Sequence, residues 1–329
     1  MAEKEKQQNN MGLELLRVFA CLWVVAVHLE QNISMPAVLR TFCQRGSTGV
    51  DIFFVLTGFL AYKSLDMVQG ASGYNRAIVI AYWKKRAIRI LPAYYAVILF
   101  YGIYFSALGK VPVDETGWGW FRYLFLLNQW IPSTEVFWTN IGAVWSVSVF
   151  ALFYLLVPFY YCLVRKFSVS LIGMVVFYVL AKVVGVYVVW MQPLRFLYLF
   201  AIGITVYLAI KEEKAKLLVA LFSGAVLILL VYDAGIAIWP AFLTAIFIAV
   251  SDGIKIKNVI IRKGIMIVSK YSYTVYLVHV AVIEVLLNHR PQSDIIYVSI
   301  FALSTVIGSL LVYYLVENPV RILGMKRNK

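Results

Sequence analysis

Ten apolar stretches, each about as long as a helix that crosses a bilayer, restrict the fold of this chain more than any other feature. About 20 apolar residues span the hydrocarbon core as a helix, and only helices or closed barrels satisfy every backbone polar group there. Since 62% of the residues are hydrophobic, we predict an all-α, polytopic transmembrane helix bundle with about ten spans. The expected spans are residues 11–32, 49–67, 87–108, 140–163, 168–190, 193–210, 217–232, 235–251, 265–288 and 295–316.

The distribution of charge gives these spans an orientation. The chain carries 30 Lys and Arg against 16 Asp and Glu, for a net charge of +14. With a cytoplasmic N-terminus, most basic residues fall between spans on the inner side. Only Arg40, Arg45, Lys110, Arg122 and Arg290 fall outside. This asymmetry follows the positive-inside rule, so it predicts cytoplasmic N- and C-termini and explains the charge without a nucleic-acid partner.

A single membrane domain is expected at residues 11–322, between a polar tail at 1–10 and a basic tail at 323–329. The three cysteines, Cys21, Cys43 and Cys162, are scattered along the chain. They provide neither a disulfide framework nor the spacing of a metal site. No metal is therefore expected. The predicted spans make the lipid bilayer the expected partner.

The first span, Met11 to Gln31, is apolar yet carries Glu14, Arg17 and His28. Ionisable groups inside a span cost several kcal/mol and usually face a partner or a cavity. Arg17 and His28 are eleven residues apart, which is roughly three helical turns, so they lie on one face about 16 Å apart along the axis. A polar stripe is therefore predicted along half of this span.

The second span opens with GVDIFFVLTGFLAY and places Asp51 at its outer end, at a depth similar to that of His28. A carboxylate beside an imidazole fixes the tautomer and raises the basicity, which is the usual arrangement of a general base. We therefore expect His28 and Asp51 to be a catalytic pair. The alternative is that Asp51 only caps its helix, since Asp is a favoured N-cap residue.

The basic stretch AYWKKRAIRILPAYY precedes the third span on the cytoplasmic side. Lys84 and Lys85 are interpreted as topology anchors. Arg86 and Arg89 are three residues apart on one helical face, and paired guanidinium groups suit phosphate oxygens. Together with Arg17, which lies near the same membrane surface, they are predicted to bind a phosphorylated donor from the cytoplasm.

Five motifs in this order resemble the acyltransferase-3 family of integral-membrane O-acyltransferases, whose members acylate surface glycans and related molecules. The family opens with Arg or Lys, ten residues and His, as in Arg17 and His28 here. The other similar stretches are GVDIFFVLTGF, RAIRILPAYY, YSYTVYLVH ending at His279, and YYLVENPVRI, which contains Glu317. The likeness runs from about residue 12 to about residue 322.

This resemblance implies a cofactor-like donor substrate, acetyl-CoA or another short acyl-CoA, and a location in a bacterial cell membrane. The implied acceptor is a hydroxyl of an extracytoplasmic glycan or lipid-linked sugar. His28 would act as general base or carry the acyl group transiently, and Asp51 would orient it. Arg17, Arg86 and Arg89 would hold the phosphates of the donor.

The fourth span departs from the family pattern. Many members carry acidic residues two and three places after its second serine, where this chain has Phe150 and Ala151. Trp145 and Ser148 still fit the pattern, so we expect them on the acceptor side, with Glu30 in place of the absent carboxylate. After the last span, Glu317 and Pro319 are interpreted as a structural helix stop.

The sequence thus predicts a membrane-bound O-acyltransferase. Two other classes of protein share its features. A transporter or flippase would use the same polar stripe as a pathway, although the chain has no internal repeat. A sensor of the same fold would bind the donor without turnover, which the absent acidic residues would allow. The acceptor, the acyl chain and the oligomeric state do not follow from the sequence.

Overall fold

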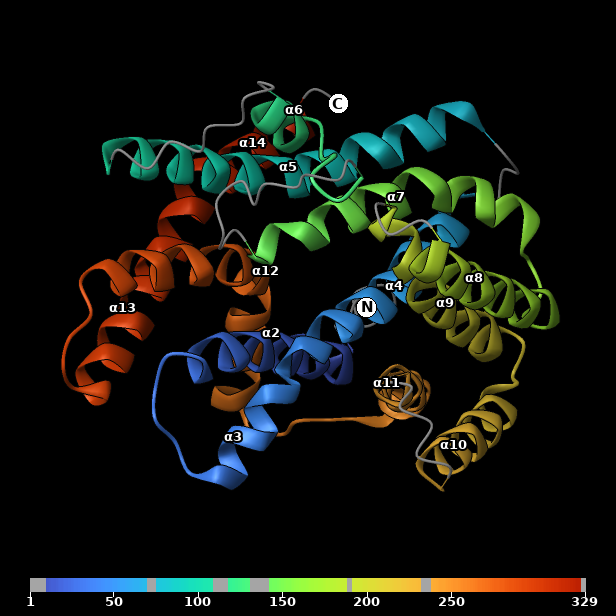
Figure 1. Ribbon diagram of the computed structural model, residues 1–329. Helices are drawn as coiled ribbons and strands as arrows, with labels where there is room; N and C mark the ends of the chain where they lie inside the picture. The colour runs from blue at the N-terminus through green and yellow to red at the C-terminus, as the bar shows by residue number, and fades with distance from the viewer. Residues whose placement is uncertain are drawn as a thin grey trace.

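The computed structural model describes residues 10–69, 75–108, 118–130, 142–187, 191–231 and 238–326. These residues form α-helices joined by short 3-10 and π segments, and no strand is found among them, which confirms the all-α fold (Figure 1). The α-helices are α2 Met11–Glu30, α3 Ala37–Gln44, α4 Gly49–Gln69, α5 Arg76–Ala107, α6 Trp118–Leu124, α7 Trp145–Leu163, α8 Phe167–Tyr187, α9 Leu197–Lys211, α10 Ala215–Val231, α11 Trp239–Val250, α12 Val259–Asn288, α13 Asp294–Val312 and α14 Asn318–Lys326. The short segments are η1 Arg45–Thr48, η2 Gly142–Val144, η3 Gln192–Phe196, η4 Ser251–Gly253 and the π-helix η5 Tyr313–Glu317.

Eight helical segments within the described residues are long and apolar enough to cross a membrane. They correspond to eight of the ten predicted spans. The other two predicted spans form α10 and α11, which are apolar but shorter. The 12 residues of α11 cover only about 18 Å as a helix, less than the hydrocarbon core of about 30 Å. The molecule is therefore a polytopic helix bundle, and the crossing by α10 and α11 stays a prediction.

The centre of the bundle is the contact between α4 and α9. Gly58 of α4 lies against the backbone of Phe200, and Gly203 of α9 lies against the carbonyl of Val55. A Cβ atom at either glycine would overlap these backbone atoms. Small residues that let two helix backbones meet are typical of membrane helix interfaces. The two glycines therefore allow the backbones of α4 and α9 to pack in direct contact.

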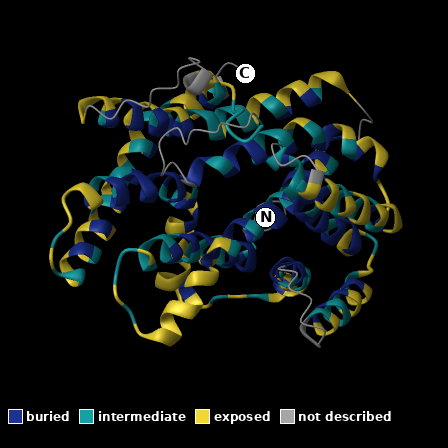
Figure 2. Cartoon of the chain, in the orientation of Figure 1, coloured by how far each residue is buried: buried dark blue, intermediate teal, exposed yellow. Residues whose placement is uncertain are grey.

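Burial separates central helices from peripheral ones (Figure 2). In the most apolar 18-residue stretch of the span that contains α9, 67% of the residues are buried, whereas in the corresponding stretch of α8 only 11% are buried. The exposed side chains of α8 are nevertheless apolar, including Ile172, Val175 and Val186. Apolar side chains on an outer face suit contact with lipid tails. These peripheral helices thus present the surface expected of a protein in a bilayer.

Two helix boundaries differ from the sequence prediction. The helix α5 begins at Arg76, eleven residues before the predicted span, because hydropathy detects only its apolar part while the basic part is helical too. The expected helix stop at Glu317 and Pro319 is wrong. The chain continues through the π-helix η5 into α14, with Pro319 in the first turn of α14, where a missing N–H is tolerated.

Some sequence predictions fall on residues outside the described ranges. These are most of the N-terminal tail, the last three residues of the basic tail, and the greater part of the predicted outer segment between the third and fourth spans.

Candidate functional site

The polar face of α2 lies against α12, and the two helices run parallel. Arg17 donates a hydrogen bond to Ser269, with 3.0 Å between the nitrogen and the hydroxyl oxygen. Further along, Cys21 Sγ is 3.4 Å from the carbonyl oxygen of Ser272. Near the other end, the rings of His28 and His279 are 5.2 Å apart. Residue numbers increase together along both helices, so the predicted stripe is confirmed as one face, and α12 covers it.

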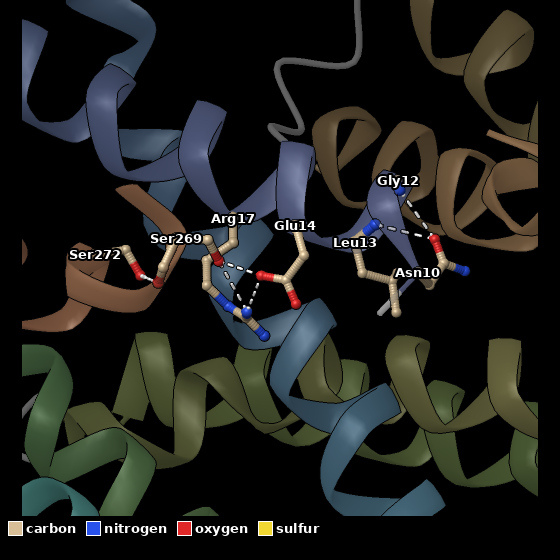
Figure 3. A network of polar contacts seen from close by, with 7 residues as sticks. All are labelled: Asn10, Gly12, Leu13, Glu14, Arg17, Ser269 and Ser272. Atoms are coloured by element: carbon tan, nitrogen blue, oxygen red, sulfur yellow. Dashed lines mark hydrogen bonds and ion pairs between the residues drawn. The ribbon is translucent and has the colours of Figure 1, made fainter. Parts of the chain in front are cut away.

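At the start of α2 the guanidinium of Arg17 is held by two groups (Figure 3). It forms an ion pair of 2.6 Å with Glu14, and the hydroxyl of Ser269 donates to the same carboxylate. Both charged side chains keep 18% of their surface exposed. The side chain of Asn10 caps the helix by accepting from the backbone N–H groups of Gly12 and Leu13. Arg17 is thus fixed in position while still open to a neighbouring cavity.

That cavity, here called the basic cavity, has a volume of about 750 Å³. It lies between α2, α5, α12, η5 and α14. Its volume is within the usual range of about 300–1,000 Å³ for ligand sites. Its positive groups outnumber its negative ones, so it suits an anionic ligand. The charged residues lining it are Arg17, Lys85, Arg89, Lys270 and Arg321 against Glu14 and Glu317.

A second, narrower space, here called the inner cavity, has a volume of about 110 Å³. Arg17 and Arg89 line both cavities, so the two spaces meet at these guanidinium groups. The rest of its wall is largely apolar and aromatic. Its aromatic lining residues are Phe53, Phe150, Tyr154, Tyr273 and Tyr276. Such a space admits a slender chain rather than a bulky anion.

The structure brings together the three arginines that the sequence selected. Arg86 also lines the inner cavity. Its guanidinium carbon lies 5.0 Å from the ring centre of Tyr82 and 5.2 Å from that of Tyr154. Stacking on aromatic faces is a favourable environment for a guanidinium. Within the described residues, neither a hydrogen bond nor an ion pair engages Arg89, so its charge is available to the cavities.

The structure does not show the predicted pairing of His28 with Asp51. Among the described residues no hydrogen bond or ion pair joins them, and the ring of His279 lies beside His28 instead. Asp51 is in the first turn of α4, where an acidic side chain favours the helix dipole. It lies within electrostatic range of Tyr198 on α9. A similar depth in the membrane does not determine the direction in which two side chains point.

The predicted acceptor-side residues have different surroundings. Glu30 forms an ion pair of 3.5 Å with Arg40 of α3 and accepts a hydrogen bond from Gln44. The hydroxyl of Ser148 on α7 donates to the side chain of Asn128. The ring of Trp145 is 4.9 Å from that of Phe196. In the part of the chain that the structure describes, no contact joins Glu30 to the two residues of α7.

The place of the acidic residue that many family members carry is occupied by an aromatic wall. The ring of Phe150 lies 4.9 Å from that of Phe54 and lines the inner cavity. A carboxylate here would face apolar rings. The departure noted in the sequence therefore changes the character of the cavity rather than leaving a gap.

Sequence reasoning missed several residues of the site. Lys270 and Arg321 line the basic cavity, and Glu317 lies within electrostatic range of Arg89, Arg321 and Lys270. Glu317 ends a π-helix, a feature frequent at functional sites. One signal was present in the sequence. Ser269 and His279 are ten residues apart on a span that runs in the same direction as the first, close to the spacing of Arg17 and His28.

Comparison with known proteins places the chain in a family. The family profile described as acyltransferase domain (Acyl_transf_3) matches residues 10–314. The acyltransferase MdmB of Streptomyces mycarofaciens is 25% identical over 368 residues, which cover 95% of this chain and 92% of that protein. The O-acetyltransferase OatA of Staphylococcus aureus is 27% identical over 363 residues. These cover 96% of this chain but 58% of OatA, so the chain spans little more than half of that relative.

A shorter similarity links part of the chain to YrhL of Bacillus subtilis, described as a putative peptidoglycan O-acetyltransferase. The two are 27% identical over 160 residues, which cover 45% of this chain and 23% of YrhL. No solved structure matches the chain significantly. The family profile covers nearly the whole membrane domain and decides against the transporter hypothesis. The chain belongs to the acyltransferase-3 family of membrane acyltransferases.

Proposed function

We propose that this protein moves an acyl group, in the first instance acetyl, from cytoplasmic acyl-CoA to a hydroxyl of an extracytoplasmic glycan or lipid-linked sugar. Its location would be the bacterial cell membrane. One observation carries the proposal: a basic cavity and a narrow inner cavity meet at Arg17 of α2 and Arg89 of α5, and α2 also holds His28. The names of two similar proteins support the acceptor class, since OatA is an O-acetyltransferase and YrhL is described as a putative peptidoglycan O-acetyltransferase.

The donor site would divide acyl-CoA between the two cavities. The phosphates suit the basic cavity, where Arg17, Arg89 and Lys270 provide charge-assisted hydrogen-bond donors. The slender acyl-bearing arm suits the inner cavity, whose volume of about 110 Å³ excludes a nucleotide. Only the acyl group then needs to travel toward the predicted outer end of α2.

The chemistry would centre on His28. As general base it takes the proton of the acceptor hydroxyl while the oxygen attacks the thioester carbonyl. The new C–O bond forms, the C–S bond breaks, and the proton passes to the leaving thiolate of CoA. As a carrier, His28 would instead hold the acyl group on a ring nitrogen between two transfers. Both routes require the same histidine.

Membranes that contain the protein, incubated with acetyl-labelled acetyl-CoA, test this function. The wild-type protein should produce a labelled extracytoplasmic product. His28→Ala should reduce the rate by about 10²–10⁴ if the histidine is a general base, and by more if it is a carrier. His289→Ala is the matched control, because His289 is exposed at the end of α12. Donor binding without any labelled product in the wild type would favour the sensor hypothesis.

A further inference from the structure

His279 is fully buried in α12, and one of its two ring nitrogens has a defined role. Nδ1 lies 3.1 Å from the carbonyl oxygen of Val275. A carbonyl can only accept, so Nδ1 carries the proton and donates. In the neutral ring Nε2 is then an acceptor. Nε2 is buried and has no hydrogen-bond partner among the described residues.

A buried acceptor without a partner is unfavourable, so its persistence calls for an explanation. Two rings border His279. The ring of Tyr276 is 5.9 Å away, but its hydroxyl is already engaged with the carbonyl of Ala143 and the hydroxyl of Ser146. The other ring is that of His28, at 5.2 Å and tilted by 47°. His28 is therefore the neighbouring side chain that has an N–H to offer.

The distance between the two histidines fits a direct interaction. A single N–H···N hydrogen bond of ordinary length, about 2.9 Å between the nitrogens, joins two imidazole rings at about the observed ring separation. At this ring separation, an N–H of the half-buried His28 ring that points at Nε2 is within hydrogen-bond reach. The exposed side chain of Gln31 also hydrogen-bonds the His28 ring. Since Gln31 engages one ring nitrogen, the other is left for His279.

We propose that His279 is the positioning residue of His28, in the place where the sequence predicted Asp51. Its Nε2 accepts the N–H of His28, so the opposite nitrogen of His28 is unprotonated, and the acceptor hydroxyl takes the place of Gln31 there. When His28 takes the hydroxyl proton, the resulting imidazolium keeps its N–H directed at Nε2. This inference rests on the proposed acyl transfer through His28.

Two substitutions separate the two ring nitrogens of His279. Gln places its amide near the position of Nε2, whereas Asn places its amide near that of Nδ1. In membranes incubated with labelled acetyl-CoA, His279→Gln should keep kcat, measured as the rate of labelled-product formation per protein at saturating acetyl-CoA, within about threefold of the wild type. His279→Asn should lower kcat by roughly 10–100-fold, less than the loss of the base itself, with the KM for acetyl-CoA unchanged. In a His28→Ala background, His279→Asn should have no further effect.

Other results would overturn the inference. If Asn preserves kcat and Gln does not, the bond to Val275 matters instead. Equal kcat in both variants, or an equal loss of folded protein in both, would assign His279 to packing. The proposed function has its own test, which is the labelled product of the wild-type protein and its loss in His28→Ala. Inactive His28→Ala beside two fully active His279 variants would remove the inference alone.

Discussion

At the scale of single residues, Arg89 is the group whose replacement should affect the donor most directly. It lines both cavities and has no ion pair or hydrogen bond within the described residues, so its charge is not already satisfied. A hydrogen bond to a charged group contributes about 1.5–3 kcal/mol. We expect Arg89→Ala to weaken acetyl-CoA binding by roughly 10–100-fold, measured by equilibrium binding to purified protein.

The matched control is Arg262→Ala, because Arg262 is exposed on α12 and lines neither cavity. Arg89→Lys should bind with an affinity between those of the wild type and Arg89→Ala, since an ammonium keeps the charge but not the planar fork of donors. Unchanged affinity in Arg89→Ala would reduce the arginine to a topology signal and remove the basic cavity as the donor site.

The sequence predicted part of this site for a clear physical reason. Helical periodicity places Arg86 and Arg89 on one face, and charge asymmetry places Arg17 near the same surface, so their convergence could be expected. The sequence could not predict the partner of His28. Depth along a span follows from residue counting, whereas the direction of Asp51 depends on how α4 rotates against α9. His279 lies more than 200 residues from His28, and only the parallel packing of α2 and α12 brings them together.

At the scale of helices, Asp66 links three elements. Its carboxylate accepts from the hydroxyls of Tyr161 on α7 and Tyr207 on α9, and from the ammonium of Lys211. Asp66→Ala leaves two tyrosine hydroxyls without this partner, at about 1–3 kcal/mol for each that stays unsatisfied. We expect a clear fall in the melting temperature of the purified protein.

Lys211→Met serves as the comparison for Asp66. The side chain of Lys211 is 50% exposed, and an exposed ion pair contributes only about 0–1 kcal/mol. Its melting temperature should therefore stay close to that of the wild type. If Lys211→Met is as destabilised as Asp66→Ala, the ion pair rather than the two tyrosine hydrogen bonds holds these helices.

The contact between α4 and α9 gives a second prediction at this scale. A Cβ at Gly203 would overlap the carbonyl of Val55, and backbone atoms cannot move aside as a flexible side chain can. Gly203→Val should therefore cost at least the roughly 1–3 kcal/mol typical of overpacking, seen as a lower melting temperature or less inserted protein. Gly224→Val is the control, because a Cβ placed there has no atom of another described segment within 4 Å. Equal stability of the two variants would show that α4 and α9 are not in close backbone contact.

At the scale of the whole molecule, the parallel arrangement of α2 and α12 constrains the topology. Both helices must cross in the same direction, which the alternation of predicted spans requires of the first and the ninth. The direction in which α12 crosses does not depend on α10 and α11, since either both of them cross or neither does. Hydropathy could identify these two segments as apolar, but it could not show that α11 has only 12 helical residues.

Single cysteines test this topology, in a background where Cys21, Cys43 and Cys162 are replaced. In intact cells an impermeant thiol reagent should label position 289 at the end of α12 and position 40 on α3. It should not label position 85, which lines the basic cavity, until the membrane is opened.

Position 233, outside the described residues, lies between the two short helices in the sequence. Its labelling in intact cells would mean that α10 and α11 cross, and protection there would leave eight spans. Labelling of position 85 in intact cells would place the basic cavity on the outer side. Cytoplasmic acyl-CoA would then have no access to Arg17 and Arg89, and the proposed direction of transfer would fail as a whole.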